Sequence, residues 1–255
     1  MLSSQRQSEI LRALKERGSY SITDLATDLD VSTETIRRNV KPLVERGLIV
    51  KFHGGIMLPE RIDEAPYRRR MQINHEAKQA VARLIASDIQ DGDAIILDNG
   101  TTTAYVADAL AGHSRLVVIT NSADIACRLA PRGGNRVFMA GGELNSDDIA
   151  TFGAPAVAFL RQFQVRYAIL SVAGISGRGE LVNFHLYEAE FANAAIEQAD
   201  ECWVVADQTK FGREAPVKVC DLKQVDVVYT DAKPSNDFRR RCAQAGVRIK
   251  IAAGE

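Results

Sequence analysis

Hydroxyl and guanidinium side chains gather where the sequence predicts the start of a helix. Ser32, Thr33 and Thr35 carry short polar side chains, and Arg37 and Arg38 follow within the next turn. Short polar groups at the N-terminal end of a helix can meet base edges in a DNA groove, and guanidinium groups can bind phosphates or guanines. These residue types at this spacing predict a helix that reads duplex DNA.

The surrounding elements have helix-turn-helix spacing. Ser21 and Asp24 fit a capping box at the start of a helix over residues 22–29, whose apolar residues recur at helical intervals. Residues 30–32 form a short turn, and Ser32 is the expected N-cap of the second helix. Two helices joined in this way are typical of a DNA-binding domain.

A strand and a hairpin turn are predicted after the second helix. Residues 37–53 contain five Lys or Arg against one acid, which is either a DNA-facing charge cluster or an ordinary solvated helix face. Residues 48–52 resemble a strand, and the glycines at 54–55 suit the turn of a wing. Lys51 and His53 would then lie near the phosphate backbone.

A second polar group follows an apolar run at residues 93–97. In residues 98–103, backbone N–H groups, hydroxyls and a predicted helix N-terminus converge, which favours an anion such as phosphate. Threonine-rich loops also serve as plain helix caps, so the loop alone leaves both interpretations open. Its candidate effector-binding residues are Asp98, Gly100, Thr101, Thr102 and Thr103.

Further polar residues follow other predicted strands. Convergent loops that carry Gly, Asn, Asp and Lys would form a polar pocket with room for a sugar, although each loop alone could be ordinary turn chemistry. The candidates from these loops and the long helix after residue 185 are Asn121, Ser122, Gly141, Gly142, Glu188, Asp207 and Lys210.

The elements that must position these residues alternate between strand and helix. Strands are predicted at 93–97, 116–120, 136–140, 166–171, 201–206, 225–230 and 247–251. Helices are predicted at 75–88, 102–111, 122–130, 154–162, 185–199 and 235–245. Short apolar strands between helices indicate a doubly wound α/β domain, in which ligands bind beyond the carboxyl ends of the strands.

Length and composition predict two domains. The chain has 255 residues, 46% apolar content and a net charge of −1. The first 75 residues carry an excess of basic side chains and the remainder an excess of acidic ones, which confines the nucleic-acid signal to the N-terminal part. We expect a DNA-binding domain at 1–58, a charged linker at 59–74 and a sensor domain at 75–255. The three arginines at 68–70 would touch DNA or stay solvated.

Several classes of protein are disfavoured. No run approaches the roughly 18 apolar residues of a membrane helix, and the N-terminus lacks a signal-peptide pattern, so a cytoplasmic protein is expected. The four cysteines show no Cys-x-x-Cys pair and the four histidines no ligand spacing, which predicts buried free thiols, no metal and no cofactor. The common nucleotide-binding glycine motifs are absent.

Six motifs in order resemble the DeoR family of bacterial transcriptional regulators over nearly the whole chain. They are residues 36–39 (IRRN), 53–55 (HGG), 98–102 (DNGTT), 120–122 (TNS), 140–144 (AGGEL) and 210–212 (KFG). The resemblance implies an N-terminal winged helix and a C-terminal sensor related to the ribose-5-phosphate isomerase and CoA-transferase folds. It also implies repression of sugar or polyol catabolism genes and release from DNA by a phosphorylated intermediate, with glycerol 3-phosphate a candidate.

Two positions depart from the family's pattern. Asn39 stands where the family commonly has Asp, and Pro42 where it has another residue. Because proline lacks an N–H and crowds the Arg38 carbonyl, we expect the reading helix to kink or stop near Lys41.

Two classes of function fit the polar residues. In a sensor, the 98–103 loop and Lys210 hold a phosphate, while Asn121, Glu188 and Asp207 bind hydroxyls. In a sugar-phosphate isomerase with an appended DNA module, Glu188, Asp207 and Lys210 would act as acids and bases. The winged helix favours the sensor, because an isomerase has no need of one. Repeated half-sites in an operator further predict a homo-oligomer, a dimer or tetramer.

Overall fold

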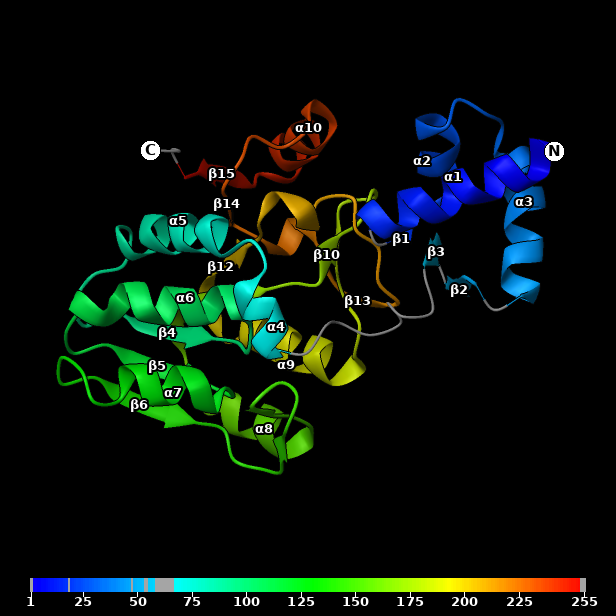
Figure 1. The fold of residues 1–255 in the computed structure, drawn as a ribbon. Coiled ribbons are helices and arrows are strands. Elements are labelled where there is room, and N and C mark those ends of the chain that lie inside the picture. The colour runs from blue at the N-terminus through cyan, green and yellow to red at the C-terminus, as the bar shows by residue number, and fades with distance from the viewer. Residues whose placement is uncertain (1, 18, 47, 53–54, 58–66, 253–255) are drawn as a thin grey trace.

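The chain forms a small N-terminal domain and a larger α/β domain, which Figure 1 shows side by side, the smaller in blue. The structure is a computed structural model and describes residues 2–17, 19–46, 48–52, 55–57 and 67–252. His53 and Gly54 of the predicted wing and residues 59–66 of the predicted linker lie outside these ranges.

The N-terminal domain is a winged helix-turn-helix. Its elements are α1 (Leu2–Arg17), β1 (Ser19–Tyr20), α2 (Ile22–Asp28), α3 (Thr33–Glu45), β2 (Val50–Phe52) and β3 (Gly55–Met57). The strands form an antiparallel sheet in the order β1-β3-β2, with Phe52 paired to Gly55 across the wing. Ile10, Leu14, Leu25 and Ile36 are fully buried in its core. The predicted winged fold is therefore confirmed.

Side-chain caps begin both helices of the helix-turn-helix. The Ser21 hydroxyl accepts the Asp24 N–H at 3.0 Å, and the Ser32 hydroxyl accepts the Thr35 N–H at 3.2 Å. Each cap satisfies one of the helix's unpaired first-turn donors. Each fixes the residue at which its helix begins.

Of the two outcomes predicted near Lys41, a kink or a stop, the structure excludes the stop. The helix continues through Pro42 to Glu45, and the Pro42 carbonyl accepts the Arg46 N–H at 3.1 Å. A proline inside a helix costs about 3 kcal/mol. Val40 and Leu43 are almost fully buried on the core side of α3. Burial of two such side chains stabilises by roughly 3–6 kcal/mol, which offsets that cost.

A seven-stranded parallel sheet forms the centre of the α/β domain. Its strands, in spatial order, are β15 (Arg248–Ile251), β14 (Val227–Thr230), β12 (Ala199–Val205), β9 (Val165–Ser171), β4 (Ala94–Leu97), β5 (Val117–Thr120) and β6 (Arg136–Met139). All six pairings are parallel. The chain order runs outward in both directions from β4 and β9. A cleft opens at such a switch point because the connections on either side leave toward opposite faces.

Helices cover both faces of the sheet, as the sequence predicted. One face is covered by α5 (His75–Ala86), α6 (Thr101–Ala109) and α7 (Ala123–Leu129). The opposite face is covered by α8 (Ala154–Leu160), α9 (Leu186–Glu197) and α10 (Asn236–Ala245). Apolar residues of each strand alternate between the two cores, so the domain is a doubly wound α/β fold.

Several small elements were not predicted. A three-stranded antiparallel sheet consists of β10 (Gly174–Ile175), β11 (Glu180–Asn183) and β13 (Val217–Asp221), and a hairpin consists of β7 (Leu144–Asn145) and β8 (Ala150–Thr151). Short 3-10 turns occur at η2 (Leu110–Gly112), η3 (Gln208–Lys210) and η4 (Leu222–Gln224). These elements are two to five residues long, too short for a clear periodicity.

One further helix, α4 (Tyr67–Gln72), lies inside the predicted linker. Tyr67 is buried, and its hydroxyl donates to the Asp124 carboxylate at 2.7 Å. Arg68 and Arg69 are exposed, as expected of solvated residues. Arg70 is only 15% exposed in its side chain, so the solvated interpretation is wrong for this arginine.

The cysteines are all unpaired. Cys202, Cys220 and Cys242 are buried free thiols as expected, but Cys127 is exposed because it lies on the outer side of α7. Within the part of the chain that the structure describes, no helix combines the length and apolarity needed to cross a membrane. The same described residues contain no cluster of His, Cys, Asp and Glu suited to a metal ion.

Candidate functional site

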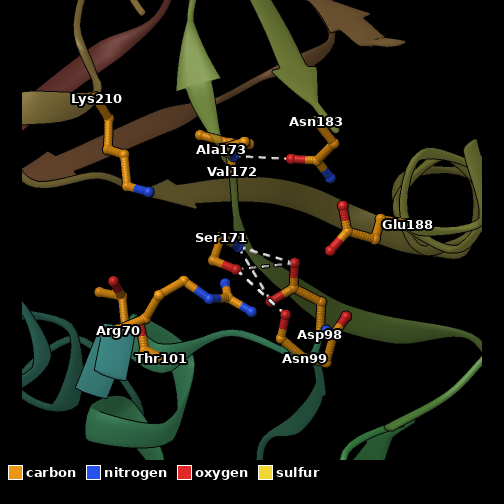
Figure 2. A pocket seen from close by; sticks show the side chains of 11 residues that line it. Arg70, Asp98, Asn99, Thr101, Ser171, Val172, Ala173, Asn183, Glu188 and Lys210 are labelled. Atoms are coloured by element: carbon orange, nitrogen blue, oxygen red, sulfur yellow. Dashed lines mark hydrogen bonds between the residues drawn. The ribbon is translucent and has the colours of Figure 1, made fainter. Parts of the chain in front are cut away.

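A polar pocket lies at the switch point, between the carboxyl ends of β4 and β9. Figure 2 shows it from close by. Counting the solvent in its open mouth, the hollow measures about 450 Å³. The lining residues are Arg70, Asp98, Asn99, Thr101, Thr102, Ser171, Val172, Ala173, Asn183, Glu188 and Lys210.

Asp98 lies on the floor of the pocket at the end of β4. Its two carboxylate oxygens accept the Ser171 backbone N–H at 3.0 and 2.9 Å. Burial raises the pKa of Asp98 well above its usual range, and the nearby Glu188 carboxylate adds to the rise. Burial therefore favours the neutral carboxyl, which can both donate to and accept from a ligand hydroxyl, so Asp98 is suited to bind one.

The loop after Asp98 is shaped for close packing. Thr103 donates its hydroxyl to the Asp98 and Gly100 carbonyls at 2.9 and 3.0 Å. A Cβ at Gly100 would approach the Ser171 hydroxyl to 2.0 Å, so only glycine fits beside β9. This packing brings the N-terminus of α6, at Thr101 and Thr102, to the pocket. No side chain among the described residues caps α6, so its first-turn N–H groups can receive an anion.

Two cationic side chains enter from one side of the pocket. Figure 2 shows Lys210 and Arg70 opposite Glu188. Arg70 also forms an ion pair of 2.8 Å with Asp148. The carbonyl end of α4, which carries Arg70, accepts hydrogen bonds from Lys78, whose amine donates to the Arg70 carbonyl and, at 2.7 Å, to the Ile73 carbonyl.

Acceptor and amide groups occupy the other side. Glu188 lies in the first turn of α9 and accepts the His185 N–H at 3.4 Å. Asn183 accepts the Ala173 N–H at 2.8 Å through its side-chain oxygen. Asn99 is 8% exposed, and its side-chain nitrogen has no hydrogen-bond partner among the residues that the structure describes. A buried amide without a partner is costly, which favours a ligand acceptor at this point.

Five of the predicted effector-binding residues line this pocket: Asp98, Thr101, Thr102, Glu188 and Lys210. Gly100 and Thr103 shape the loop behind them. The other five do not line it and are Asn121, Ser122, Gly141, Gly142 and Asp207.

Those five residues lie outside the pocket, and three of them have structural hydrogen bonds there. Asn121 donates to the Thr151 carbonyl at 3.0 Å, and Ser122 caps α7. Gly141 and Gly142 are exposed on the loop after β6. Asp207 caps η3 by accepting the Thr209 N–H at 2.9 Å. Asn121 and Ser122 follow β5, and Gly141 and Gly142 follow β6. Neither strand neighbours β9, because β4 lies between β9 and β5.

Sequence reasoning missed six lining residues: Arg70, Asn99, Ser171, Val172, Ala173 and Asn183. Ser171, Val172 and Ala173 follow the end of a predicted strand, so the rule that ligands meet carboxyl strand ends could have identified them. Asn99 stood within the predicted loop. Arg70 and Asn183 had no such signal, because they lie on α4 and β11, which were not predicted.

The predicted DNA-reading side chains that the structure describes are exposed or half-buried. Ser32, Arg37, Arg38 and Lys51 are exposed, and Thr33 and Thr35 are half-buried. By contrast, Asn39 is only 5% exposed and donates to the Thr35 carbonyl at 2.9 Å. Asn39 therefore belongs to the inner side of α3 and not to its reading face.

A winged helix-turn-helix joined to an α/β domain with a polar pocket is the architecture of a transcriptional regulator that carries its own sensor. Residues 6–61 match the DeoR-like helix-turn-helix domain, and residues 73–232 match the DeoR C terminal sensor domain. The chain belongs to the DeoR family of transcriptional regulators, and this confirms the resemblance seen in its motifs.

Similar proteins extend over almost the whole chain. The glycerol-3-phosphate regulon repressor of Escherichia coli (strain K12) is 37% identical over 92% of this chain and 93% of its own length. The HTH-type transcriptional repressor CsqR of the same organism is 34% identical over 96% of this chain and 94% of its own. The HTH-type transcriptional repressor GlcR of Bacillus subtilis (strain 168) is 30% identical, with coverages of 98% and 97%.

Solved structures resemble parts of the chain more distantly. A D-ribose-5-phosphate isomerase in complex with phospho-erythronic acid aligns at a TM-score of 0.40 and 17% identity, covering 54% of each chain. The Pyrococcus horikoshii OT3 translation initiation factor eIF-2B aligns at a TM-score of 0.42 and 18% identity, covering 78% of this chain and 68% of that one. These low scores say nothing about what the pocket binds.

Proposed function

We propose that this chain represses a sugar or polyol catabolism operon and leaves its operator when a phosphorylated sugar or polyol fills the pocket. The observation that carries this proposal is the division of the pocket into two sides. Lys210, Arg70 and the N-terminus of α6 suit a phosphate, whereas Asp98 and Glu188 suit hydroxyl groups. A molecule with a phosphate at one end and hydroxyls at the other matches both sides.

Glycerol 3-phosphate is the first effector to test. A relative that covers 92% of the chain at 37% identity is named for the glycerol-3-phosphate regulon. One phosphate and two hydroxyls suit a pocket in which cationic side chains lie opposite a carboxylate. Phosphorylated pentoses and hexoses form the comparison set.

The DNA-binding role is assigned to residues 1–58 and the sensing role to residues 75–255, joined at 59–74. The operator contacts in this proposal are Ser32, Thr33, Thr35, Arg37, Arg38, Lys51 and His53. Because operators of helix-turn-helix proteins repeat their half-sites, the active form is a homo-oligomer. As a regulator of bacterial genes, it acts in the cytoplasm.

The chain binds its effector without transforming it. An isomerase would need acid and base groups around one substrate, and the trio considered for that role is Glu188, Asp207 and Lys210. Asp207 does not line the pocket and caps η3 instead. The trio is therefore not assembled around one ligand.

Operator release tests the proposal. The operator is first selected from random duplexes with the full-length protein, and its affinity is then measured with glycerol 3-phosphate, sugar phosphates and their unphosphorylated forms. Only a phosphorylated compound should weaken binding, and a tenfold effect corresponds to about 1.4 kcal/mol of coupling. Equal release by free glycerol or free sugars would contradict the proposal. Measurable turnover of a sugar phosphate would favour the enzyme instead.

A further inference from the structure

The wing strand β3 docks onto the α/β domain through Met57. Met57 is 3% exposed and packs into a small apolar cluster whose other members are Ala173, Val182, Phe184 and Ala215. The preceding residue, Ile56, is buried in the core of the N-terminal domain. Neighbouring residues of a strand face opposite sides. Ile56 therefore packs into the core of the N-terminal domain, and Met57 packs against the sensor.

A buried hydrogen-bond pair forms a second contact between the domains. The Ser19 hydroxyl accepts the Glu214 N–H at 3.0 Å and donates to the Glu214 carbonyl at 3.1 Å. Ser19 and Glu214 are each 3% exposed. Separation of the domains would leave both backbone groups without this partner, so the docked arrangement is specific.

The sensor residues in these two contacts are the chain neighbours of pocket residues. Ala173 lines the pocket and also belongs to the Met57 cluster. Asn183 lines the pocket between Val182 and Phe184, two further members of that cluster. Glu214 follows Lys210 on a short segment in which Arg213 donates to the Ala173 carbonyl at 2.9 Å. A movement at the pocket can therefore reach the DNA-binding domain through the Met57 cluster and through the segment that carries Glu214.

Asn183 stands where pocket and docking contact meet. Its side-chain oxygen accepts the Ala173 N–H, the dashed line at the top of Figure 2, while its nitrogen is turned toward the pocket. Asn183 is 6% exposed. The Asn183 amide thus fixes the backbone of Ala173, which packs with Met57, and its nitrogen can donate to a ligand.

We propose that Asn183 is the positioning residue that links effector binding to operator release. Resting on the proposed function, this inference adds the route: an effector oxygen that binds the Asn183 amide draws it from Ala173 and loosens the packing of Met57. Arg37 and Arg38 are exposed while Met57 and Ser19 are buried, so the docked arrangement can present the reading helix to DNA, and the proposal assigns operator binding to it. Loss of docking then frees the reading helix from a fixed position in the oligomer.

The test measures both affinities in full-length variants. Met57→Ala should weaken operator binding about tenfold without ligand and strengthen glycerol 3-phosphate binding, because both changes follow from one shift toward the undocked state. Ser19→Ala should change both affinities in the same directions. Asn183→Asp keeps an oxygen that can accept the Ala173 N–H but removes the donor, so glycerol 3-phosphate should change its operator affinity much less than it changes the parent's.

Ile56→Val is the matched control on the same strand. It perturbs the N-terminal core and should leave the affinity for glycerol 3-phosphate unchanged. If Met57 had only a structural role, Met57→Ala would lower the affinities for both the operator and glycerol 3-phosphate, or would change neither. Unchanged operator affinity in Met57→Ala and Ser19→Ala overturns the inference, and this result needs no ligand. A parent protein that ignores every phosphorylated compound would instead contradict the proposed function, while the operator measurements still decide the docking.

Discussion

At the scale of single residues, Lys210 illustrates what a loop position can do in the folded chain. It lies on a 3-10 turn that Asp207 caps, and it enters the pocket opposite Glu188. The sequence predicted both Lys210 and Asp207 as ligand contacts. The structure separates their roles, because a cap must turn its oxygen toward the backbone and away from the ligand.

Lys210→Met should abolish the response to effector without affecting operator affinity. Loss of one hydrogen bond to a charged group costs about 1.5–3 kcal/mol, which is roughly a 10- to 150-fold weaker affinity for the phosphorylated effector. Titration calorimetry measures this change, and a gel-shift titration measures the operator. Lys223→Met, an exposed lysine outside the pocket, is the control. A Lys210→Met protein that releases its operator like the parent would refute the assigned role.

Glu214→Gln should stabilise the protein near neutral pH. Burial chiefly raises the pKa of Glu214, with a further rise from Asp24 and Glu180, while the Gly177 N–H and Arg178 oppose it. A raised carboxyl pKa means that the folded state favours the protonated form. Its stabilising contribution is therefore complete below the unfolded value of 4.5 and is lost as pH rises through the folded value.

Gln keeps the oxygen that accepts the Gly177 N–H at 3.0 Å but has no charge to bury. We expect its thermal midpoint to exceed the parent's by about 2 °C at neutral pH, the effect of less than 1 kcal/mol in a chain of this size. The difference should shrink as the pH falls. Glu190→Gln, at an exposed position on α9, should show no such trend. A difference that stays constant with pH would exclude Glu214 as its source.

At the scale of elements, helix α3 combines a buried and an exposed side. Ile36, Val40 and Leu43 attach it to the core, and this attachment carries the helix through Pro42. Arg37 and Arg38 lie on the opposite, exposed side. Packing therefore decides where α3 ends, while the exposed side remains available to DNA.

The double variant Arg37→Ala/Arg38→Ala should weaken operator binding and flatten its salt dependence. Removing one phosphate-binding side chain lowers the slope of log affinity against log salt by about 0.9. Gel-shift titrations at several salt concentrations measure this slope. The matched control is Arg240→Ala/Arg241→Ala on α10, which removes two arginines from the sensor domain. An unchanged slope in the α3 variant would show that another element reads the DNA.

Helix α4 shows how a short element can acquire a function through its partners. Arginine, methionine and glutamine favour helix, but six residues are too few for a helix that is stable by itself, and α4 has no apolar stripe. Tertiary contacts hold the element: Tyr67 is buried, Lys78 binds its terminal carbonyls, and Tyr105 donates to the Met71 carbonyl at 2.9 Å. Together they place Arg70 at the pocket.

At the scale of the whole molecule, the sensor and the DNA-binding domain share a buried contact. A ligand that changes the operator affinity must bind the folded sensor, and binding to the folded state alone stabilises the chain against unfolding. A ligand at 100 times its dissociation constant adds about 2.7 kcal/mol. For a domain of this size that corresponds to a rise of roughly 5–10 °C in thermal midpoint.

A thermal-shift screen tests this expectation with phosphorylated sugars and polyols beside their free forms. The phosphorylated effector should raise the midpoint in the parent and in Arg37→Ala/Arg38→Ala, since the reading helix takes no part in ligand binding. Lys210→Met should show little rise at the same concentration. A rise caused equally by the free polyol would show that the cationic side of the pocket does not select the ligand.

The sequence alone determined the elements whose pattern is long and local. The strands of the central sheet and the helices that cover it agree with their predicted ranges to within a few residues, because buried parallel strands are short apolar runs between amphipathic helices. The reading helix could be located from Ser32, since a cap acts on the N–H of Thr35 three residues away. The loop at Asp98 was identifiable because it follows a central strand.

Only the tertiary structure decided which polar loops share one site. The order of strands brings β4 beside β9, so Ser171 meets Asp98 although 73 positions separate them, while Asn121 and Gly142 remain at other strand ends. Arg70, Asn183 and Met57 acquire their places through contacts between distant segments. Such contacts leave no periodicity in the sequence, because burial of a side chain depends on what packs against it and not on its neighbours in the chain.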